Sequence, residues 1–401
     1  MNELSSLGLI LLLALGAGHL VKFARVPEVT GYILAGVVLG PSMLGWVSTQ
    51  NLSALEILSE VALGLILFSV GTVFELSRFR RVGRQVLQLT LYESALAALL
   101  VTVGMLLLGV GWQAALLLGA IAVATAPAST LMVIREVDSE GPLTDSLLAI
   151  IALNNIYCII AFSLVGVAID LSSGLGSSAS FVGTLYGALY PLVWQLAGSV
   201  ALGFLVGLLL ARWASTISET GETLILLGGS ILFCVGVARV LELSPLIASM
   251  AVGATMVNLF HRSQPLFETL SEADPPFYAI FFVLAGADLD VSLVGSLGLV
   301  GLVYLLGRAG GKFLGAQIGA RRLGMAPSVQ SYLGLTLLAQ AGLAVGLTIT
   351  AEHRFPEVAP AVTAIVLASV AVYEMFGPIA TRWALMRSGE SRLGQPEELV
   401  I

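Results

Sequence analysis

Apolar runs of about 20 residues recur along this chain from one end to the other, separated by short polar loops. As an α-helix, a run of that length crosses the ~30 Å hydrocarbon layer of a membrane. The composition agrees, because 57% of the residues are hydrophobic and only 11% are charged. A soluble domain carries about a quarter charged residues. The sequence therefore predicts an all-α polytopic membrane protein.

The polar residues argue against several other classes of protein. The net charge of −7 is spread over short loops, without a basic patch interleaved with aromatic residues, so no nucleic-acid partner is expected. Cys158 and Cys234 both lie in apolar runs, which indicates packing rather than a disulfide or a metal site. We predict no enzymatic activity, no cofactor and no metal site, and membrane lipid around the chain.

Hydropathy and basic residues together predict the number of spans and their orientation. Nearly all basic loop residues follow odd-numbered predicted spans or lie in the tail. The loops that follow even-numbered spans contain only Arg239 and Arg354. By the positive-inside rule, the N-terminus is expected outside and the C-terminus in the cytoplasm. The thirteen predicted spans are 5–23, 28–48, 53–72, 84–109, 112–134, 142–168, 181–213, 221–241, 244–262, 276–291, 295–320, 327–350 and 359–386.

Two pairs of segments predict an inverted repeat. "GYILAGVVLGP" (31–41) resembles "PLIASMAVGAT" (245–255), and "GAIAVATAPASTLMVI" (119–134) resembles "GLTLLAQAGLAVGLTI" (334–349). The two offsets are nearly equal, and each pair lies seven spans apart, so the halves would insert in opposite orientations. Inverted repeats are a common architecture of secondary transporters. The alternative is that Gly/Ala-rich membrane helices resemble one another without any repeat.

The second pair of segments also predicts two broken helices. In "ATAPAST", Pro127 removes a backbone donor near the middle of a span. Gln340, Gly342 and Gly346 weaken the corresponding stretch of the later span. Interrupted helices at matching positions in two halves point to a substrate site, whereas the alternative for Pro127 is an ordinary proline kink.

Four ionisable residues lie well inside predicted spans: Glu93, Glu374, Arg308 and Lys312. A charge at that depth costs several kcal/mol unless it is paired, so it marks a functional site by default. The alternative is two structural ion pairs, which we favour for Arg308 with Glu93 or Glu374. For Lys312 we favour proton coupling, because the charge of a buried lysine is readily lost.

These features together resemble the monovalent cation:proton antiporter superfamily, in the branch of Kef-type and related sodium/proton exchangers. The resemblance covers nearly the whole chain and preserves the order of the helices. The segments that carry it are "VPEVTGYILAGVVLGPSMLG" (26–45), "FYAIFFVLAGADLDVS" (277–292), "GRAGGKFLGAQIGARRLG" (307–324) and "GLTLLAQAGLAVGL" (334–347). It implies the sodium/proton antiporter-like fold, with two crossing broken helices.

The resemblance also locates an ion site, at which this chain departs from the family. Members carry Asp-Asp or Asn-Asp where "AIIALNNIYCII" (149–160) has Asn154 and Asn155. A Thr-Asp-Pro motif of the family reads Thr125-Ala126-Pro127 here. Lys312 aligns with a lysine that pairs with the first Asp, a position now held by Asn154. Amides can offer oxygens to a cation, but they cannot exchange a proton for it.

The resemblance implies a homodimer in a bacterial inner (plasma) membrane, with a moving core and a fixed dimerisation domain. Because no nucleotide-binding domain follows the last span, gating through such a domain is not expected. The implied organisation is 1–80 for dimerisation helices 1–3, 84–170 for core helices 4–6, 181–213 for a linker helix, 221–291 for dimerisation helices 8–10, 295–386 for core helices 11–13, and 387–401 for a cytoplasmic tail.

The predicted function is a Na⁺ or K⁺:proton antiporter that works by elevator-type alternating access. The alternatives are a transporter of the same fold without proton exchange (a uniporter or an anion carrier), or a transport-inactive membrane sensor. Lys312 has two possible states: either Glu93 or Glu374 reaches it and keeps it charged, or Arg308 takes the carboxylate and Lys312 is left to carry the proton. We favour the second. The predicted ion ligands are Asn154, Asn155, Thr125 and Gln340, and the predicted charge-coupling residues are Lys312, Arg308, Glu93 and Glu374.

Overall fold

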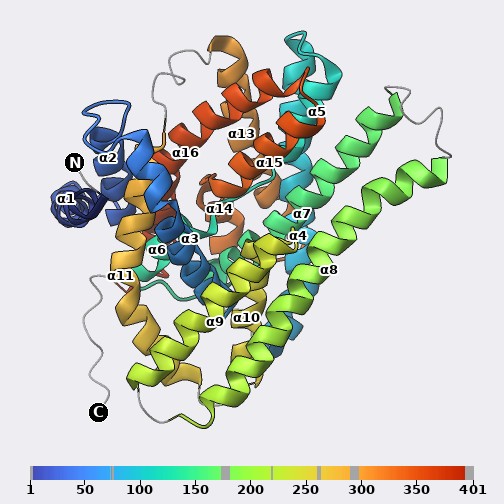
Figure 1. The fold of residues 1–401 in the computed structure, drawn as a ribbon. Coiled ribbons are helices and arrows are strands. Elements are labelled where there is room, and N and C mark those ends of the chain that lie inside the picture. Colours follow the sequence, from blue (N-terminus) through green and yellow to red (C-terminus); the bar gives the residue numbers. More distant parts are fainter. Residues whose placement is uncertain are drawn as a thin grey trace.

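A computed structural model describes residues 3–72, 74, 76–172, 181–217, 220–259, 263–289 and 298–392 of the chain. The ends of the predicted spans 244–262 and 276–291, with Arg262, and most of the predicted tail 387–401 lie outside the described residues. The described part is helical (Figure 1), and its β-structure is limited to the isolated bridge between Ser139 and Ser391.

Fifteen helices make up the described part of the chain. The first eight are α1 (Glu3–Phe23), α2 (Glu28–Leu39), α3 (Thr49–Gly71), α4 (Leu76–Leu107), α5 (Trp112–Ile121), α6 (Pro127–Glu136), α7 (Pro142–Ser172) and α8 (Phe181–Ala214). The others are α9 (Thr220–Val240), α10 (Pro245–Leu259), α11 (Ser263–Ala287), α13 (Gly298–Arg322), α14 (Pro327–Thr336), α15 (Gly342–Arg354) and α16 (Ala359–Ser388).

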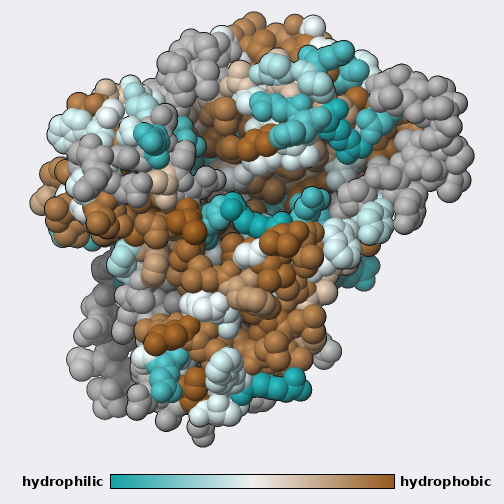
Figure 2. Space-filling model, viewed as in Figure 1, coloured by the Kyte–Doolittle hydropathy of each residue, from teal (hydrophilic) through white to brown (hydrophobic). Residues whose placement is uncertain are grey.

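The helices agree with the prediction of an all-α membrane protein. Seven of the described helices are long and apolar enough to cross a membrane, so the count of thirteen spans is not confirmed. Two predicted spans, 112–134 and 327–350, each form two shorter helices. Large apolar side chains such as those of Leu12, Leu205 and Phe233 are exposed, as expected for helices that face lipid. Figure 2 shows hydrophobic residues over much of one face of the molecule.

Both predicted interruptions are present, and they touch each other. One separates α5 from α6, which starts at Pro127, and the other separates α14 from α15, which starts at Gly342. The Ala126 N–H donates to the Ala339 carbonyl at 2.9 Å. Proline suits a first helical position because its missing N–H would have no partner there. The expectation that Gly346 belongs to the second interruption is wrong, because it lies inside the regular helix α15.

Helix α13 packs closely along α4 because small residues line their contact. A Cβ atom on Gly311 would lie only 2.3 Å from the Ala97 Cα, and one on Gly315 only 2.6 Å from the Glu93 Cα. Glycine therefore allows the two backbones to approach in a way that a larger residue would prevent. This close approach brings Glu93 on α4 against the face of α13 that carries Lys312.

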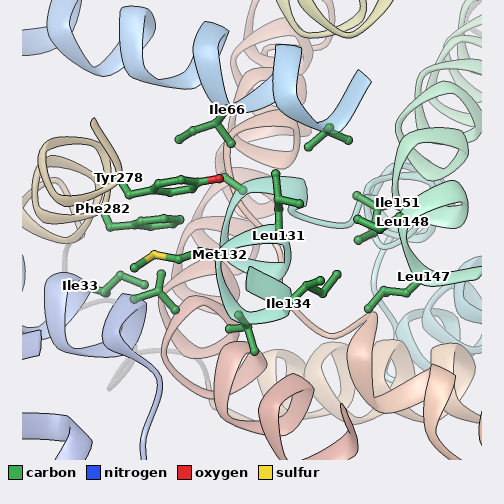
Figure 3. Packing of buried hydrophobic residues seen from close by; sticks show 14 of the residues in the cluster. Ile33, Ile66, Leu131, Met132, Ile134, Leu147, Leu148, Ile151, Tyr278 and Phe282 are labelled. Carbon is green, nitrogen blue, oxygen red and sulfur yellow. The ribbon is translucent and has the colours of Figure 1, made fainter. Parts of the chain in front are cut away.

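A second packing centre surrounds the short helix α6. Figure 3 shows its side chains meeting those of α2, α3 and α11 on one side and those of α7 on the other. This cluster therefore packs α2, α3 and α11 against α7 and against α6, which begins at the end of the first interruption. The side chains labelled there are Ile33, Ile66, Leu131, Met132, Ile134, Leu147, Leu148, Ile151, Tyr278 and Phe282.

Residues at the start of the predicted tail pack back onto the molecule. Gly389 ends α16 in the left-handed conformation, with φ 79°, a common way to end a helix. Ser391 then forms its bridge with Ser139, and the Glu140 N–H donates to the Glu390 carbonyl at 2.9 Å. The last described residues are thus attached to the loop between α6 and α7.

Candidate functional site

Asn154 connects three elements in the interior. Its Nδ2 donates to Thr125 Oγ1, in the first interruption, at 3.0 Å. Its Oδ1 lies 3.1 Å from Ser94 Oγ, on α4. All three side chains are buried. Asn154 therefore holds α7 against α4 and the first interruption, and its carbonyl oxygen is already used once.

Lys312 and Glu93 form a fully buried ion pair. The Lys312 Nζ atom lies 2.8 Å from Glu93 Oε2, and both side chains are 0% exposed. The ammonium also donates to the Val123 carbonyl at 2.7 Å and to Thr125 Oγ1 at 3.1 Å. Three acceptors match the three protons of the group. The other oxygen of Glu93 lies 2.8 Å from Ser94 Oγ.

This pairing corrects the prediction for Arg308. Among the described residues Arg308 forms no ion pair with Glu93 or Glu374, and Glu93 pairs with Lys312 instead. The glycine contact between α4 and α13 explains the choice, because it sets Glu93 directly beside Lys312. The expectation that Arg308 takes the carboxylate and leaves Lys312 unpaired is therefore wrong.

Arg308 instead binds the carbonyl groups of both interruptions. Its guanidinium donates to two carbonyls of the first interruption and two of the second, and its Cζ lies 4.4 Å from the centre of the Tyr373 ring. Carbonyls that lose their helical partners inside a membrane need donors, and the five N–H groups of arginine supply them in a fixed fork. Its contacts are Nε to Ala122 O at 3.1 Å, Nη2 to Ala124 O at 2.6 Å, Nη1 to Leu338 O at 2.6 Å and Nη2 to Ala339 O at 3.3 Å.

Gln340 lies in the second interruption and reaches across to the first. Its Nε2 donates to the Ile121 carbonyl at 3.2 Å and to the Tyr304 hydroxyl at 3.2 Å. Its Oε1 is buried without a hydrogen-bond partner. Tyr304 was not predicted from the sequence, although it lies four residues before Arg308 and so shares its helix face. Ser94, next to Glu93, was also missed.

Asn155 differs from its neighbour because its amide has no partner. The residue is 2% exposed, and neither Nδ2 nor Oδ1 accepts or donates a hydrogen bond. It follows Ile151 by one helical turn, and Ile151 belongs to the cluster around α6 (Figure 3). On α6 itself, the buried Ser129 hydroxyl is also without a partner. Each buried polar group without a hydrogen-bond partner costs about 1–3 kcal/mol of folding stability, unless a ligand supplies the missing partner.

Glu374 is a second buried carboxylate, separate from the Lys312–Glu93 pair. It is 5% exposed, and its Oε1 has no hydrogen-bond partner. Its neighbours on α16 contact both α13 and the second interruption, since the Tyr373 hydroxyl donates to the Leu305 carbonyl at 2.5 Å and Gly377 packs on Ala339. Among the described residues Glu374 forms no ion pair.

Comparisons with known proteins agree on one family. The sequence profile described as "Sodium/hydrogen exchanger, transmembrane" matches residues 8–387. The fold is similar to that of the sodium proton antiporter MjNhaP1 from Methanocaldococcus jannaschii. That likeness has a TM-score of 0.72 at 18% identity, and it covers 98% of this chain and 99% of the other.

Three relatives match most or part of the chain in sequence. The ammonium/H(+) antiporter subunit AmhT of Alkalihalophilus pseudofirmus is 24% identical over 336 residues, covering 84% of this chain and 83% of AmhT. The glutathione-regulated potassium-efflux system protein KefC of Salmonella typhi is 26% identical over 91% of this chain, which spans 58% of KefC. The iron transporter MagA of Paramagnetospirillum magneticum is 33% identical over 35% of this chain and 31% of MagA.

Proposed function

Because the chain belongs to the sodium/hydrogen exchanger family, we propose that it exchanges a monovalent cation, Na⁺ or K⁺, for protons across a membrane. One observation carries the proposal. Asn155 presents an unpartnered amide beside Asn154, whose contacts lead through Thr125 to the buried Lys312–Glu93 pair. A candidate oxygen ligand therefore lies next along α7 to a hydrogen-bonded network that contains a titratable pair.

The cation ligands in this proposal are Asn155 Oδ1 and, from α6, Ser129 Oγ. Both oxygens are buried and unpartnered, and neutral oxygens suit a dehydrated alkali cation. Thr125 positions other groups rather than binding the ion, because its Oγ1 already accepts from Asn154 and Lys312. A hydroxyl has two acceptor lone pairs, and both are then used.

The proton site in this proposal is the Lys312–Glu93 pair, because an amide cannot release a proton. When a cation binds near Asn155, Lys312 loses one proton, and the Glu93 carboxylate balances the cation in its place. The buried charge then stays constant in both states. Since a net charge inside the membrane is costly, this exchange would be one cation for one proton and electroneutral.

We also propose the elevator arrangement implied by the family. In it, α4–α7 and α13–α16 form the moving core, α1–α3 and α9–α11 form the fixed dimerisation domain, and α8 links them. The close packing of α13 on α4 and the contact between the two interruptions support a common core. The apolar cluster around α6 would form much of the sliding surface. The N-terminus would be outside and the C-terminus in the cytoplasm.

A flux assay in proteoliposomes tests this function. The purified chain is reconstituted with a pH-sensitive dye inside, and Na⁺, K⁺ and Li⁺ are added outside in turn. We expect proton release with Na⁺ or K⁺, and its loss in Asn155→Ala. The matched control is Asn258→Ala, because that amide lies on α10 and donates to the Phe74 carbonyl away from the interruptions.

Three results would contradict the proposal. Cation uptake without proton movement would indicate a uniporter, and anion movement alone would indicate an anion carrier. Absence of any flux in a folded, reconstituted protein would indicate a sensor.

A further inference from the structure

A groove runs along the outer side of the contact between α4 and α13. Its volume is about 560 Å³. It extends along α4 from Gln88 to Leu99 and along α13 from Gly315 to Ile318, and it reaches Leu323 just after the end of α13. The eleven-residue step along α4 corresponds to about 16 Å of helix. That length is about half of the ~30 Å hydrocarbon layer, so the groove has the depth of one leaflet.

The walls of the groove are apolar over most of its length. Leu91, Ala95 and Leu99 line it and are exposed, and Ile318 lines it from α13. The glycine contact explains the shape, because it draws the two helix backbones together and leaves no large side chain at Gly315. A long apolar ligand therefore fits the groove.

The Gln88–Leu323 end of the groove has a basic rim. Arg84 lies one turn before Gln88, and Arg321 and Arg322 adjoin Leu323; all three are exposed. The Arg322 Cζ atom lies 5.8 Å from the centre of the Tyr92 ring, which is part of the groove. Among the residues that the structure describes, none of these three arginines forms an ion pair.

We propose that this groove binds an anionic phospholipid, with one acyl chain along α4 and α13 and the phosphate on the basic rim. The charge of the rim and the apolar depth behind it match the two parts of such a lipid. Basic pockets between membrane helices are known to bind anionic headgroups. A zwitterionic lipid would fit the apolar part equally well, but its headgroup would gain less from three arginines that form no ion pair among the described residues.

The groove shares a wall with the buried ion pair. Tyr92 and Gly315 line it, and Gly315 packs directly on Glu93. A lipid seated there would cover the α4–α13 contact that holds Glu93 beside Lys312. A ligand that binds only the folded state stabilises that state against unfolding. The site does not depend on which ion the protein transports, so it can be tested separately from the proposed function.

The test measures thermal unfolding of the purified full chain in detergent, followed by its tryptophan fluorescence. Phosphatidylglycerol, phosphatidylcholine and free glycerol phosphate are added in separate titrations. We expect phosphatidylglycerol to raise the melting temperature by about 3 °C or more, phosphatidylcholine by less than half of that, and glycerol phosphate not at all. Native mass spectrometry counts the phosphatidylglycerol molecules that remain bound.

Two variants disrupt different parts of the site. Arg321→Gln with Arg322→Gln removes most of the rim, and Ala95→Trp fills the apolar part. In each variant, phosphatidylglycerol should raise the melting temperature by no more than half as much as in the wild type. Each variant should also retain one phosphatidylglycerol molecule fewer than the wild type. The matched controls are Arg387→Gln, at an exposed arginine on α16, and Val103→Trp, at an exposed position of α4 beyond the groove.

Four results would overturn the proposal. These are equal shifts with the two lipids, a full shift with glycerol phosphate alone, unchanged lipid retention in both variants, and equal losses in the variants and their controls. If one variant fails to fold, the other variant and the number of lipids bound to the wild type still test the proposal.

Discussion

Lys312 shows why individual polar residues in this core are tightly constrained. Its ammonium has three acceptors, on Glu93, Val123 and Thr125, and none of it is exposed. Breaking a buried ion pair by removing one partner costs about 3–5 kcal/mol, because the remaining charge loses its compensation. Each partner of the pair is thus needed for stability as well as for the proposed exchange.

We predict that Lys312→Gln lowers the free energy of unfolding by about 3–5 kcal/mol and abolishes cation-driven proton release. The double variant Lys312→Gln/Glu93→Gln should recover much of the stability, because no lone charge remains, but not the proton release. Lys312→Arg should also fail to exchange protons, because a guanidinium does not deprotonate. Thermal unfolding and the dye assay measure both properties. A single variant with wild-type stability and flux would eliminate the pair as the proton site.

Asn155 gives the second prediction at this scale. Its amide is buried and unpartnered, so Asn155→Asp would place a titratable carboxylate where the proposed cation binds. We expect this variant to create or raise pH-dependent Na⁺ or K⁺ exchange, because a carboxylate can alternate between a proton and a cation. The assay is proton flux at several pH values, with Asn154→Asp as comparison. Equal activity of wild type and variant at every pH would show that Asn155 is not at the ion site.

The interruptions of the helices depend on donors from another helix. The first and the second interruption each expose carbonyl groups, and Arg308 on α13 donates to both. Proline and glycine at the helix starts explain why the helices break, whereas Arg308 explains why the broken form is stable inside a membrane.

Another helix end is held by Glu390. Its carboxylate accepts from the Leu143 and Thr144 N–H groups of α7 at 2.8 Å each and from Ser328 of α14 at 3.0 Å. A negative charge at a helix N-terminus is stabilising. The segment after α16 therefore fixes the starts of two helices of the proposed core.

We predict that Glu390→Gln lowers the free energy of unfolding by about 1–3 kcal/mol, because one oxygen acceptor and the charge are lost. Glu357→Gln is the control, since Glu357 is exposed in a loop. Thermal unfolding of both variants checks this. Equal melting temperatures for the two would show that the Glu390 contacts add no stability.

At the scale of the whole molecule, a polar contact at Glu136 joins the proposed domains. Glu136, at the end of α6, accepts from the Glu28 N–H of α2 at 2.9 Å and from Arg382 of α16 at 2.8 Å. Lys22 also pairs with Glu28. Movement of the proposed core against α1–α3 would have to break this contact together with part of the apolar cluster around α6.

We predict a homodimer whose protomers meet through the proposed dimerisation domain. After replacement of the two free cysteines, Cys158 and Cys234, a cysteine at the exposed Val38 of α2 should crosslink between protomers in membranes. A cysteine at the exposed Leu99 of α4 should not, because α4 belongs to the moving core. Gel mobility under oxidising conditions gives the yield. Equal yields at both positions would contradict this arrangement.

The sequence by itself determined the class of protein and the places where helices break. Repeated apolar runs require membrane helices, and Pro127 and Gly342 start the second half of each interrupted span, because both act on the local backbone. Four buried charges could also be identified in this way. The prediction that Gly346 belongs to the second interruption was wrong, because glycine weakens a helix without ending it.

Only the tertiary structure decided which charge meets which partner. Glu93 and Lys312 are more than 200 residues apart, and their pairing depends on the glycine contact that sets the rotation and spacing of α4 and α13. Arg308 is on the same helix face as Lys312, yet the carbonyls of the two interruptions take its donors. Spacing along one helix cannot reveal which of two neighbouring cations a distant carboxylate will reach.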